Sequence, residues 1–357
     1  MRLIRARIDT RAMRGNLARL RQAAPGARVM AVIKANAYGH GLVPAALALS
    51  GADAFAVARI EEAAALRAAG ITQPIVLLEG IINAGQLAEA AQLQLELVVH
   101  EPGQIALLEQ FRGSHRFGLW LKVDTGMNRL GFRTDEFHAA WARLAALQPA
   151  PLALRVLTHL ASADEPGSPQ TTEQLARLAP LVAGLDAEVS VANSAALLAL
   201  PETHRQWVRP GLALYGASPF AGRRANALGL VPAMTLLTTV IARRELRVGE
   251  SVGYGATWRA SRPTRLAILA GGYGDGLLRS LPAGAPVWLA GQRAPIVGRI
   301  SMDMLAVDVT ELPEVRVGEQ AQLWGPDLPV EELAELAGTI PYELLCGVSQ
   351  RVPIELV

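Results

Sequence analysis

The chain has 357 residues, of which 51% are hydrophobic and 18% are charged. This composition excludes a disordered chain and provides enough apolar surface for a large core. The net charge of +2 gives no general basic field, so the composition offers no reason to expect a nucleic-acid partner.

Short apolar segments alternate with helical patterns over the first two thirds of the chain. The predicted strands are residues 29–33, 54–58, 74–78, 95–99, 117–123, 152–158, 188–192 and 206–208. The predicted helices between them are residues 42–50, 61–69, 85–93, 103–111, 135–147, 171–183 and 194–200. Continuous apolar strands that alternate with helices indicate a parallel sheet covered on both faces. Eight such units predict an α/β fold, a closed TIM-like (β/α)₈ barrel, with an open doubly wound sheet as the alternative.

The pattern changes near residue 230. The predicted strands beyond it are residues 235–242, 264–270, 287–289, 304–308 and 320–323, and residues 330–337 form the one predicted helix. We therefore predict a barrel domain over residues 1–230 and a mainly β domain over residues 231–357. Residues 1–9 are a candidate strand partner of the second domain.

Three features bear on the compartment. Cys346 is the single cysteine, and we expect a small buried residue in a reducing environment. The first ten residues carry a charge every two or three positions, which is unlike a secretory signal. No stretch reaches ~18 uninterrupted apolar residues. We therefore expect a cytoplasmic protein without a membrane partner.

Five polar residues follow the predicted barrel strands, where catalytic residues of such barrels lie. They are Lys34, Lys122, His159, Ser194 and Arg209. Taken singly, Ser194 is equally well interpreted as an ordinary helix N-cap, and Arg209 as a surface arginine before Pro210.

Lysine is rare in this chain, because only Lys34 and Lys122 among the 34 basic residues are lysines. Either lysine could simply extend from a strand end to water. Alternatively, Lys34 provides an amine that can form a Schiff base. A guanidinium does not lose its proton, so two lysines in an arginine-rich chain point to sites that need an amine.

Five ordered motifs give the chain a resemblance to bacterial alanine racemases. Residues 31–41, AVIKANAYGHG, resemble the pyridoxal phosphate attachment motif of that family. The other motifs are residues 121–131, 208–216, 253–256, and the pair 272–276 and 299–303. The resemblance covers essentially the whole chain. It implies a barrel followed by a β domain, pyridoxal 5'-phosphate as cofactor, and interconversion of L- and D-alanine for peptidoglycan supply or alanine catabolism.

The resemblance also implies a two-base mechanism in a homodimer with shared active sites. Lys34 would hold the cofactor as an internal aldimine and serve the D face, and Tyr254 of the partner subunit would serve the L face. Arg209 would donate to the pyridine nitrogen. His159 resembles the histidine that lies in the same hydrogen-bonding network.

Further roles carry over from the family by position. The phosphate would be bound by Tyr38, Ser194, Tyr342, Gly211 and Leu212. The substrate carboxylate would be bound by Arg129 and by Met302 of the partner subunit, and Lys122 would carry a carbamate that holds Arg129. The residues that resemble the corridor and gate are Asp164, Tyr273, Arg279, Arg299 and Asp303.

Three alternatives remain beside this interpretation. One is an amino-acid racemase of broader specificity, because a pocket walled by Tyr254, Tyr342 and Met302 rejects an extra methylene by only ~1–3 kcal/mol. Another is a non-catalytic pyridoxal phosphate-binding protein, although such proteins lack the large β domain. The third is a barrel-fold decarboxylase, against which Arg209 argues. The remaining histidines lack ligand-like spacing, so we predict no metal site.

Overall fold

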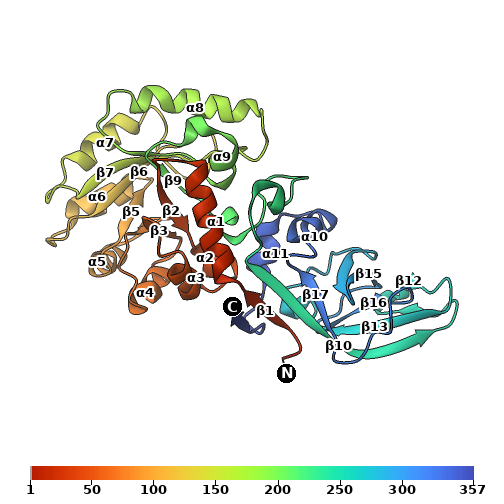
Figure 1. The fold of residues 1–357 in the computed structure, drawn as a ribbon. Helices are drawn as coiled ribbons and strands as arrows, with labels where there is room; N and C mark the ends of the chain where they lie inside the picture. The colour runs from red at the N-terminus through yellow and green to blue at the C-terminus, as the bar shows by residue number, and fades with distance from the viewer. Residues whose placement is uncertain (1) are drawn as a thin grey trace. The chain divides into compact units, whose positions relative to one another are not determined.

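The computed structural model describes residues 2–357, which form two compact units (Figure 1). One unit, the barrel unit, consists of Leu17–Ala37 and Leu42–Leu214. The other, the β unit, consists of residues 2–16, Tyr38–Gly41 and Tyr215–Val357. Neither unit is a single continuous segment.

Eight parallel strands form the barrel unit. They are β2 (Arg28–Val32), β3 (Ala54–Val57), β4 (Ile75–Leu77), β5 (Glu96–Val99), β6 (Gly118–Lys122), β7 (Ala153–Leu157), β8 (Val189–Ser190) and β9 (Trp207–Val208). Each strand pairs with the next in the chain, and β9 pairs with β2 to close the ring, with Arg28 opposite Trp207. The predicted closed barrel is confirmed, and the open sheet is wrong.

Helices lie around the outside of the barrel strands (Figure 1). They are α3 (Leu42–Ala48), α4 (Ile60–Ala68), α5 (Ala84–Gln92), α6 (Pro102–Gln110), α7 (Phe137–Ala145), α8 (Pro169–Val182) and α9 (Ser194–Ala199). Helix α8 shows why they pack there: it buries Thr171, Gln174, Leu178 and Leu181, whose spacing places them on one face. An earlier helix, α1 (Thr10–Ala23), begins in a β-unit segment and ends in a barrel-unit segment. In the described part of the chain, no helix combines the length and apolar character needed to cross a membrane.

A cluster of paired charges joins residues at or near the barrel strands β5, β7 and β8. Arg155 donates to Glu96 at 3.1 Å and to Glu188 at 2.7 Å. The indole N–H groups of Trp120 and Trp207 donate to the same two carboxylates. These groups satisfy one another's hydrogen bonds, so we interpret the cluster as structural.

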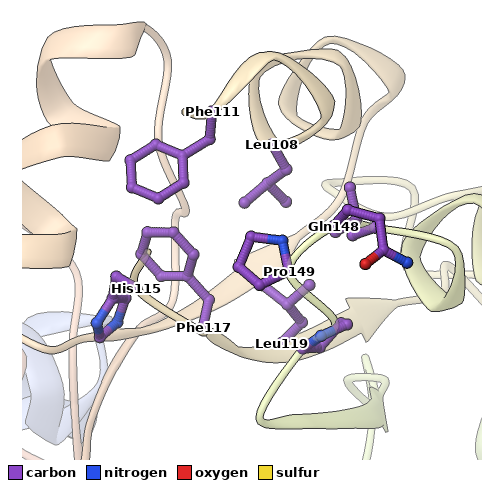
Figure 2. Close-up of a pocket in the computed structure, with 9 residues that line it drawn as sticks. Leu108, Phe111, His115, Phe117, Leu119, Gln148 and Pro149 are labelled. Atoms are coloured by element: carbon purple, nitrogen blue, oxygen red, sulfur yellow. The ribbon is translucent and has the colours of Figure 1, made fainter. Parts of the chain in front are cut away.

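A small apolar cavity of about 20 Å³ lies beside the start of β6 (Figure 2). His115, Phe111 and Phe117 lie around it, and the His115 ring meets the Phe117 ring edge-on at 4.6 Å. Burial lowers the pKa of His115. His115 is therefore a packing residue.

The β unit contains a ring of six antiparallel strands with two further strands beside it. The strands are β1 (Arg5–Ile8), β10 (Met234–Leu246), β13 (Thr264–Ala270), β14 (Pro286–Leu289), β15 (Gln292–Val297), β16 (Met304–Asp308), β17 (Gln320–Trp324) and β18 (Ile354–Leu356). The long strand β10 pairs with both β13 and β17, which closes the ring. β1 pairs antiparallel with β10 and parallel with β18. A short hairpin, β11 (Ser251–Val252) and β12 (Trp258–Arg259), extends from this unit.

Two helices of the β unit follow the ring, α10 (Val330–Ala337) and α11 (Pro341–Gly347). The prediction of a single helix here is wrong, because α11 is only seven residues long and starts at a proline, too short to show a helical repeat. Cys346 lies on α11 and is exposed, so its predicted burial is also wrong. Glu331 of α10 is buried and accepts hydrogen bonds from the backbone N–H groups of Ser218 and Ala225 at 2.9 and 3.0 Å.

Candidate active site

Five predicted residues of the barrel unit lie at the carboxyl ends of its strands. Lys34 follows β2, Lys122 ends β6, and Arg209 follows β9. His159 comes two residues after β7, and Ser194 starts the helix after β8. Parallel strands of a barrel end at one rim, so the fold brings these side chains to the same face.

Arg209 is the most enclosed charged group of this rim, with 4% of its surface exposed. Its Nη1 donates to Ser190 Oγ at 2.7 Å, and its Nη2 donates to the Thr158 carbonyl at 2.6 Å and to His159 Nδ1 at 3.2 Å. Burial lowers the pKa of Arg209 to about 10, so the guanidinium remains charged at neutral pH. The interpretation as an exposed surface arginine is wrong.

His159 is neutral in this environment. Burial, followed by the positive charges of Arg209 and Arg129, holds the pKa of His159 well below its ordinary value. Because a guanidinium can only donate, Nδ1 of His159 is the acceptor and its Nε2 carries the proton. The hydrogen bond from Arg209 therefore fixes the tautomer of the imidazole.

Gln174 of α8 connects two rim loops and is not among the residues predicted from the sequence. It is fully buried, and its Nε2 donates to the His159 carbonyl at 2.9 Å and to Thr125 Oγ1 at 3.2 Å. Its Oε1 accepts from the Ala161 N–H at 2.9 Å. A glutamine on the otherwise apolar face of the helix predicted over 171–183 was the signal that could have found it.

Lys122 is buried among positive charges, with 8% of its surface exposed. Burial lowers its pKa from 10.5 to about 8, the charges of Arg129 and Arg209 act in the same direction, and Asp124 opposes them. A substantial fraction of the amine is therefore neutral near pH 8. Extension of this side chain into open water is excluded.

Arg129 lies on a closed loop between β6 and α7. The loop is held at its base by the Asp124 N–H to the Phe132 carbonyl and by the Phe132 N–H to the Lys122 carbonyl, at 2.8 and 2.9 Å. Asp124 Oδ1 also accepts from three successive backbone N–H groups of residues 126–128. Gly131 has φ of +131°, and a Cβ there would lie 2.7 Å from the Asp124 nitrogen. The closure therefore requires glycine at this position.

The segment labelled α2 (Lys34–Tyr38) is a left-handed turn. Ala35, Asn36, Ala37 and Tyr38 all have φ of 53–54°. Each such residue costs roughly 1–2 kcal/mol unless it is glycine. The Ala35 N–H donates to Glu62 Oε1 of α4 at 2.7 Å. Strain of this kind collects at functional sites.

Ser194, Gly211 and Leu212 lie on adjoining segments of the barrel unit. Ser194 Oγ is buried and accepts from the Gly211 N–H at 2.9 Å and the Ala213 N–H at 3.3 Å. The N-cap of α9 is Asn193, whose side chain accepts from the Ala196 N–H. The interpretation of Ser194 as the N-cap is therefore wrong. Leu212 follows Gly211 as the first residue of a 3₁₀ turn, Leu212–Tyr215.

Tyr38 and Tyr342 lie close together in the β unit, with ring centroids 5.7 Å apart. Burial of Tyr38, assisted by Tyr342 and Cys346, raises its pKa. Gly39 follows Tyr38, and a Cβ there would lie 2.1 Å from the Leu345 carbonyl of α11. This close approach holds the residue 38–41 segment against α11, where Tyr342 lies.

The other predicted residues of the β unit lie on adjoining, exposed turns. Tyr254 lies on the turn of the β11–β12 hairpin, and Gly255 next to it lies beside the Arg299 guanidinium. The Tyr273 N–H donates to the Ser301 carbonyl at 3.1 Å, which places the Tyr273 turn beside Met302. Tyr254, Met302 and Tyr273 are 67%, 52% and 40% exposed. We call Tyr254, Tyr273 and Met302 the hydrophobic turn cluster.

Three predicted gate residues differ in how they are held. Asp303 accepts from Arg351 at 2.6 Å, and Arg351 also pairs with the buried Asp275 at 3.0 Å. Arg279 in the β unit and Asp164 in the barrel unit are exposed. Arg351 was missed, because nothing in its sequence context distinguishes it from the other arginines.

Three of the histidines outside the rim bond to backbone carbonyls. His40 Nδ1 lies 2.8 Å from the Tyr38 carbonyl, His100 Nε2 lies 2.9 Å from that of Glu79, and His204 Nε2 lies 2.7 Å from that of Leu197. Over residues 2–357, no three His, Cys, Asp or Glu side chains converge in a way that could hold a metal ion.

The fold and its rim define the chain as a (β/α)₈ barrel protein with a separate β unit. The family profile "Alanine racemase, N-terminal domain" matches residues 8–219, and "Alanine racemase, C-terminal domain" matches residues 233–356. The chain therefore belongs to the alanine racemase family and is a racemase, an isomerase.

Relatives and solved structures agree with this assignment. The chain is 47% identical over 350 residues to an alanine racemase of Shewanella baltica (strain OS185), covering 98% of each chain. It is 46% identical over 355 residues to one of Yersinia pestis, covering 99% of each. The crystal structure of the biosynthetic alanine racemase from Pseudomonas aeruginosa matches with a TM-score of 0.97 and 46% identity over 100% of both chains. The structure of alanine racemase from Acinetobacter baumannii matches with a TM-score of 0.94 and 36% identity over 100% of both chains.

Proposed function

We propose that this chain interconverts L- and D-alanine with pyridoxal 5'-phosphate held at the barrel rim. The observation that carries the proposal is the state of Arg209. Its two Nη atoms are held by a hydroxyl, backbone carbonyls and a neutral imidazole. A buried guanidinium held in this way keeps its charge at neutral pH and can only donate, which fits a hydrogen bond to a pyridine nitrogen.

The other rim residues fit the remaining parts of this cofactor. Lys34 supplies the amine that would attach it. Ser194 Oγ already accepts two N–H groups, one of them from Gly211, so its own O–H can donate to a phosphate. Leu212, Tyr38 and Tyr342 complete the proposed phosphate donors. When bound, the cofactor withdraws electrons from an attached amino acid and makes its Cα proton acidic.

Racemisation requires one proton carrier on each face of the Cα atom. We assign the D face to the Lys34 amine and the L face to the phenol of Tyr254 of the partner subunit. Tyr254 is two-thirds exposed on the hydrophobic turn cluster, which is consistent with a residue that completes another copy's site. The proposal therefore includes a homodimer with shared active sites.

Arg129 is assigned to the substrate carboxylate, because its planar fork suits bidentate binding. The backbone N–H of Met302 of the partner subunit would assist it. A pocket walled by Tyr254, Tyr342 and Met302 favours a methyl side chain. Asp164, Tyr273, Arg279, Arg299 and Asp303 are assigned to the entry corridor and its gate.

Lys122 is assigned a carbamate. A neutral amine adds CO₂ and releases a proton, and a pKa of about 8 supplies that neutral amine. The product is an anion between the Arg129 and Arg209 charges, which removes the repulsion that the ammonium suffers there. Incubation with ¹³C-bicarbonate should give a carbamate carbon signal in the wild type and none in Lys122→Met. The same signal in both proteins would contradict the assignment.

Racemisation of L- and D-alanine, followed by circular dichroism with pyridoxal phosphate present, tests the proposed function. We expect equal end points from both enantiomers and at least tenfold lower rates with serine and lysine. Comparable rates with all three amino acids would favour the broader racemase. Cofactor binding without any racemisation would favour a binding protein. The Pseudomonas aeruginosa relative described as biosynthetic favours D-alanine supply as the role.

A further inference from the structure

The turn after Lys34 needs support from outside its own segment. Ala35, Asn36 and Ala37 have left-handed φ values, and of these residue types only asparagine is enriched in that region. The Ala37 N–H donates to the Ile33 carbonyl at 2.9 Å, which closes the turn locally. The Leu42 N–H donates to Asn36 Oδ1 at 2.9 Å. Both bonds come from the segment itself and move with it.

Glu62 provides a contact from a neighbouring strand–helix unit. Its Oε1 accepts from the Ala35 N–H at 2.7 Å, and its Oε2 accepts from the N–H groups of Ala58 and Arg59 at 2.9 and 3.2 Å. Ala58 and Arg59 connect β3 to α4. One carboxylate thus joins the turn after β2 to the start of α4.

The backbone on both sides of Lys34 is held by this same neighbouring unit. On the amino side, the Ile33 N–H donates to the Ala56 carbonyl of β3 at 2.9 Å. On the carboxyl side, the Ala35 N–H donates to Glu62. Two fixed points that flank one residue determine the direction in which its side chain leaves the backbone.

We propose that Glu62 is a positioning residue for Lys34, which fixes the strained turn so that the amine meets the cofactor aldehyde in a reactive orientation. This inference rests on the proposed function. The carboxylate is required because its two oxygens accept three N–H groups. A glutamine has one acceptor oxygen and would turn an NH₂ group toward a backbone donor.

The test follows covalent attachment of pyridoxal phosphate to cofactor-free, full-length protein. Attachment is trapped with borohydride at intervals, and Lys34 is quantified by peptide mass spectrometry. We expect Glu62→Ala to slow attachment about tenfold or more, and Glu62→Gln to lie between it and the wild type. Glu61→Gln, an exposed neighbour in the same turn of α4, should match the wild type. A Glu62→Ala rate within about twofold of Glu61→Gln would overturn the proposal.

Two further variants separate positioning from a general loss of stability. Gln104 ties the start of α6 to the loop before it in the same manner, accepting from the His100 N–H at 2.7 Å and donating to the Ile81 carbonyl. Gln104→Ala should lower the melting temperature comparably without slowing attachment at Lys34. In the Glu62→Ala background, Ala35→Gly should recover part of the attachment rate, because glycine adopts the left-handed region without strain.

Equal slowing in Gln104→Ala, or no recovery from Ala35→Gly, would contradict the inference. The wild type is the separate control for the proposed function. If it attaches no pyridoxal phosphate at Lys34, the cofactor assignment fails. If it attaches normally and the Glu62 variants do as well, only the role of Glu62 fails.

Discussion

The barrel rim and the hydrophobic turn cluster hold their functional residues in opposite ways. At the rim, Arg209 and Lys122 are almost fully buried, and each polar contact of Arg209 comes from the same unit. In the turn cluster, Tyr254 and Met302 are more than half exposed. The rim is thus organised by its own unit, whereas the cluster presents apolar surface that its own unit leaves uncovered. The rim residues of the proposed site are therefore positioned by the chain's own contacts, whereas the contribution proposed for the cluster requires a second copy to cover it.

The largest expected effect on the racemisation rate comes from removing the Lys34 amine of the rim. Lys34→Ala should lower alanine racemisation at least about 10⁴-fold, roughly 5 kcal/mol of transition-state stabilisation, because both cofactor attachment and one proton transfer are lost. Lys34→Arg should be equally inactive, since a guanidinium keeps its charge but cannot lose its proton. Initial rates by circular dichroism measure both. An active Lys34→Arg protein would show that the rim does not use amine chemistry.

The next largest effect is expected for Tyr254, and it tests whether the hydrophobic turn cluster completes the rim of a second copy. Tyr254→Phe should lower racemisation about 10³-fold, or ~4 kcal/mol, through loss of one proton carrier. An equal mixture of the Tyr254→Phe and Lys34→Ala proteins, after subunit exchange, should regain about a quarter of the wild-type activity. About half of the dimers are then mixed, and each mixed dimer has one intact site of two. No recovery, with mixed dimers detected by native mass spectrometry, would place both residues in the same subunit's site.

A smaller effect concerns the buried charge of Lys122. Its folded-state pKa of about 8 lies below the unfolded value of 10.5, so the unfolded chain binds more protons between these pH values. Wild-type stability in CO₂-free buffer should therefore rise as the pH rises from 8 toward 10.5. Lys122→Met should be more stable than the wild type at pH 7, by up to about 3 kcal/mol, and this advantage should shrink across that window. Urea unfolding of both proteins at pH 7 and at pH 9.5 measures this difference in unfolding free energy at each pH.

A pH-independent difference between the two proteins would show that Lys122 is not buried as a cation. Added bicarbonate provides a second comparison. It should stabilise the wild type at pH 8 and leave Lys122→Met unchanged.

The smallest effect comes from loosening one rim loop while Lys122 and Arg129 themselves stay unchanged. Asp124→Ala removes the acceptor of three backbone N–H groups and should cost about 1–2 kcal/mol of unfolding free energy. Because Arg129 lies on that loop, the KM for alanine should rise more than kcat falls. Asp135→Ala, whose side chain is 76% exposed, should change stability by less than ~0.5 kcal/mol. An unchanged KM in Asp124→Ala would show that Arg129 is positioned independently of the loop.

The sequence predicted those parts of the molecule that depend on local pattern. The barrel strands were predictable because most are largely apolar runs, as in Ala54–Val57, which is buried throughout. The rim lysines, His159 and Arg209 were predictable as positions, because barrel strands end at one face. The electrostatic environment of these residues was not predictable, because the pKa of Lys122 depends in part on Arg209, which lies 87 positions further along the chain.

Other features gave no local signal at all. The left-handed turn after Lys34 consists largely of alanine, which normally avoids that conformation. Glu62 looks like one more acidic residue in a first helical turn. The exposure of Cys346 follows from the unexpected helix α11. The contact between Glu62 and the Ala35 N–H joins residues 27 positions apart, which a local residue pattern does not reveal.

The pairing of β1 has a consequence for how the chain folds during synthesis. β1 is made first, yet one edge waits for β10 and the other for β18, residues 354–356. The barrel ring closes once β9 has been made, at residue 208, so the barrel unit can fold while the ribosome is still adding the β unit. At about 5–20 residues per second, β1 stays incompletely paired for several seconds after the barrel is complete. A nascent chain stalled before β18 would therefore expose an unpaired β1 edge, the kind of surface that chaperones bind and that promotes aggregation.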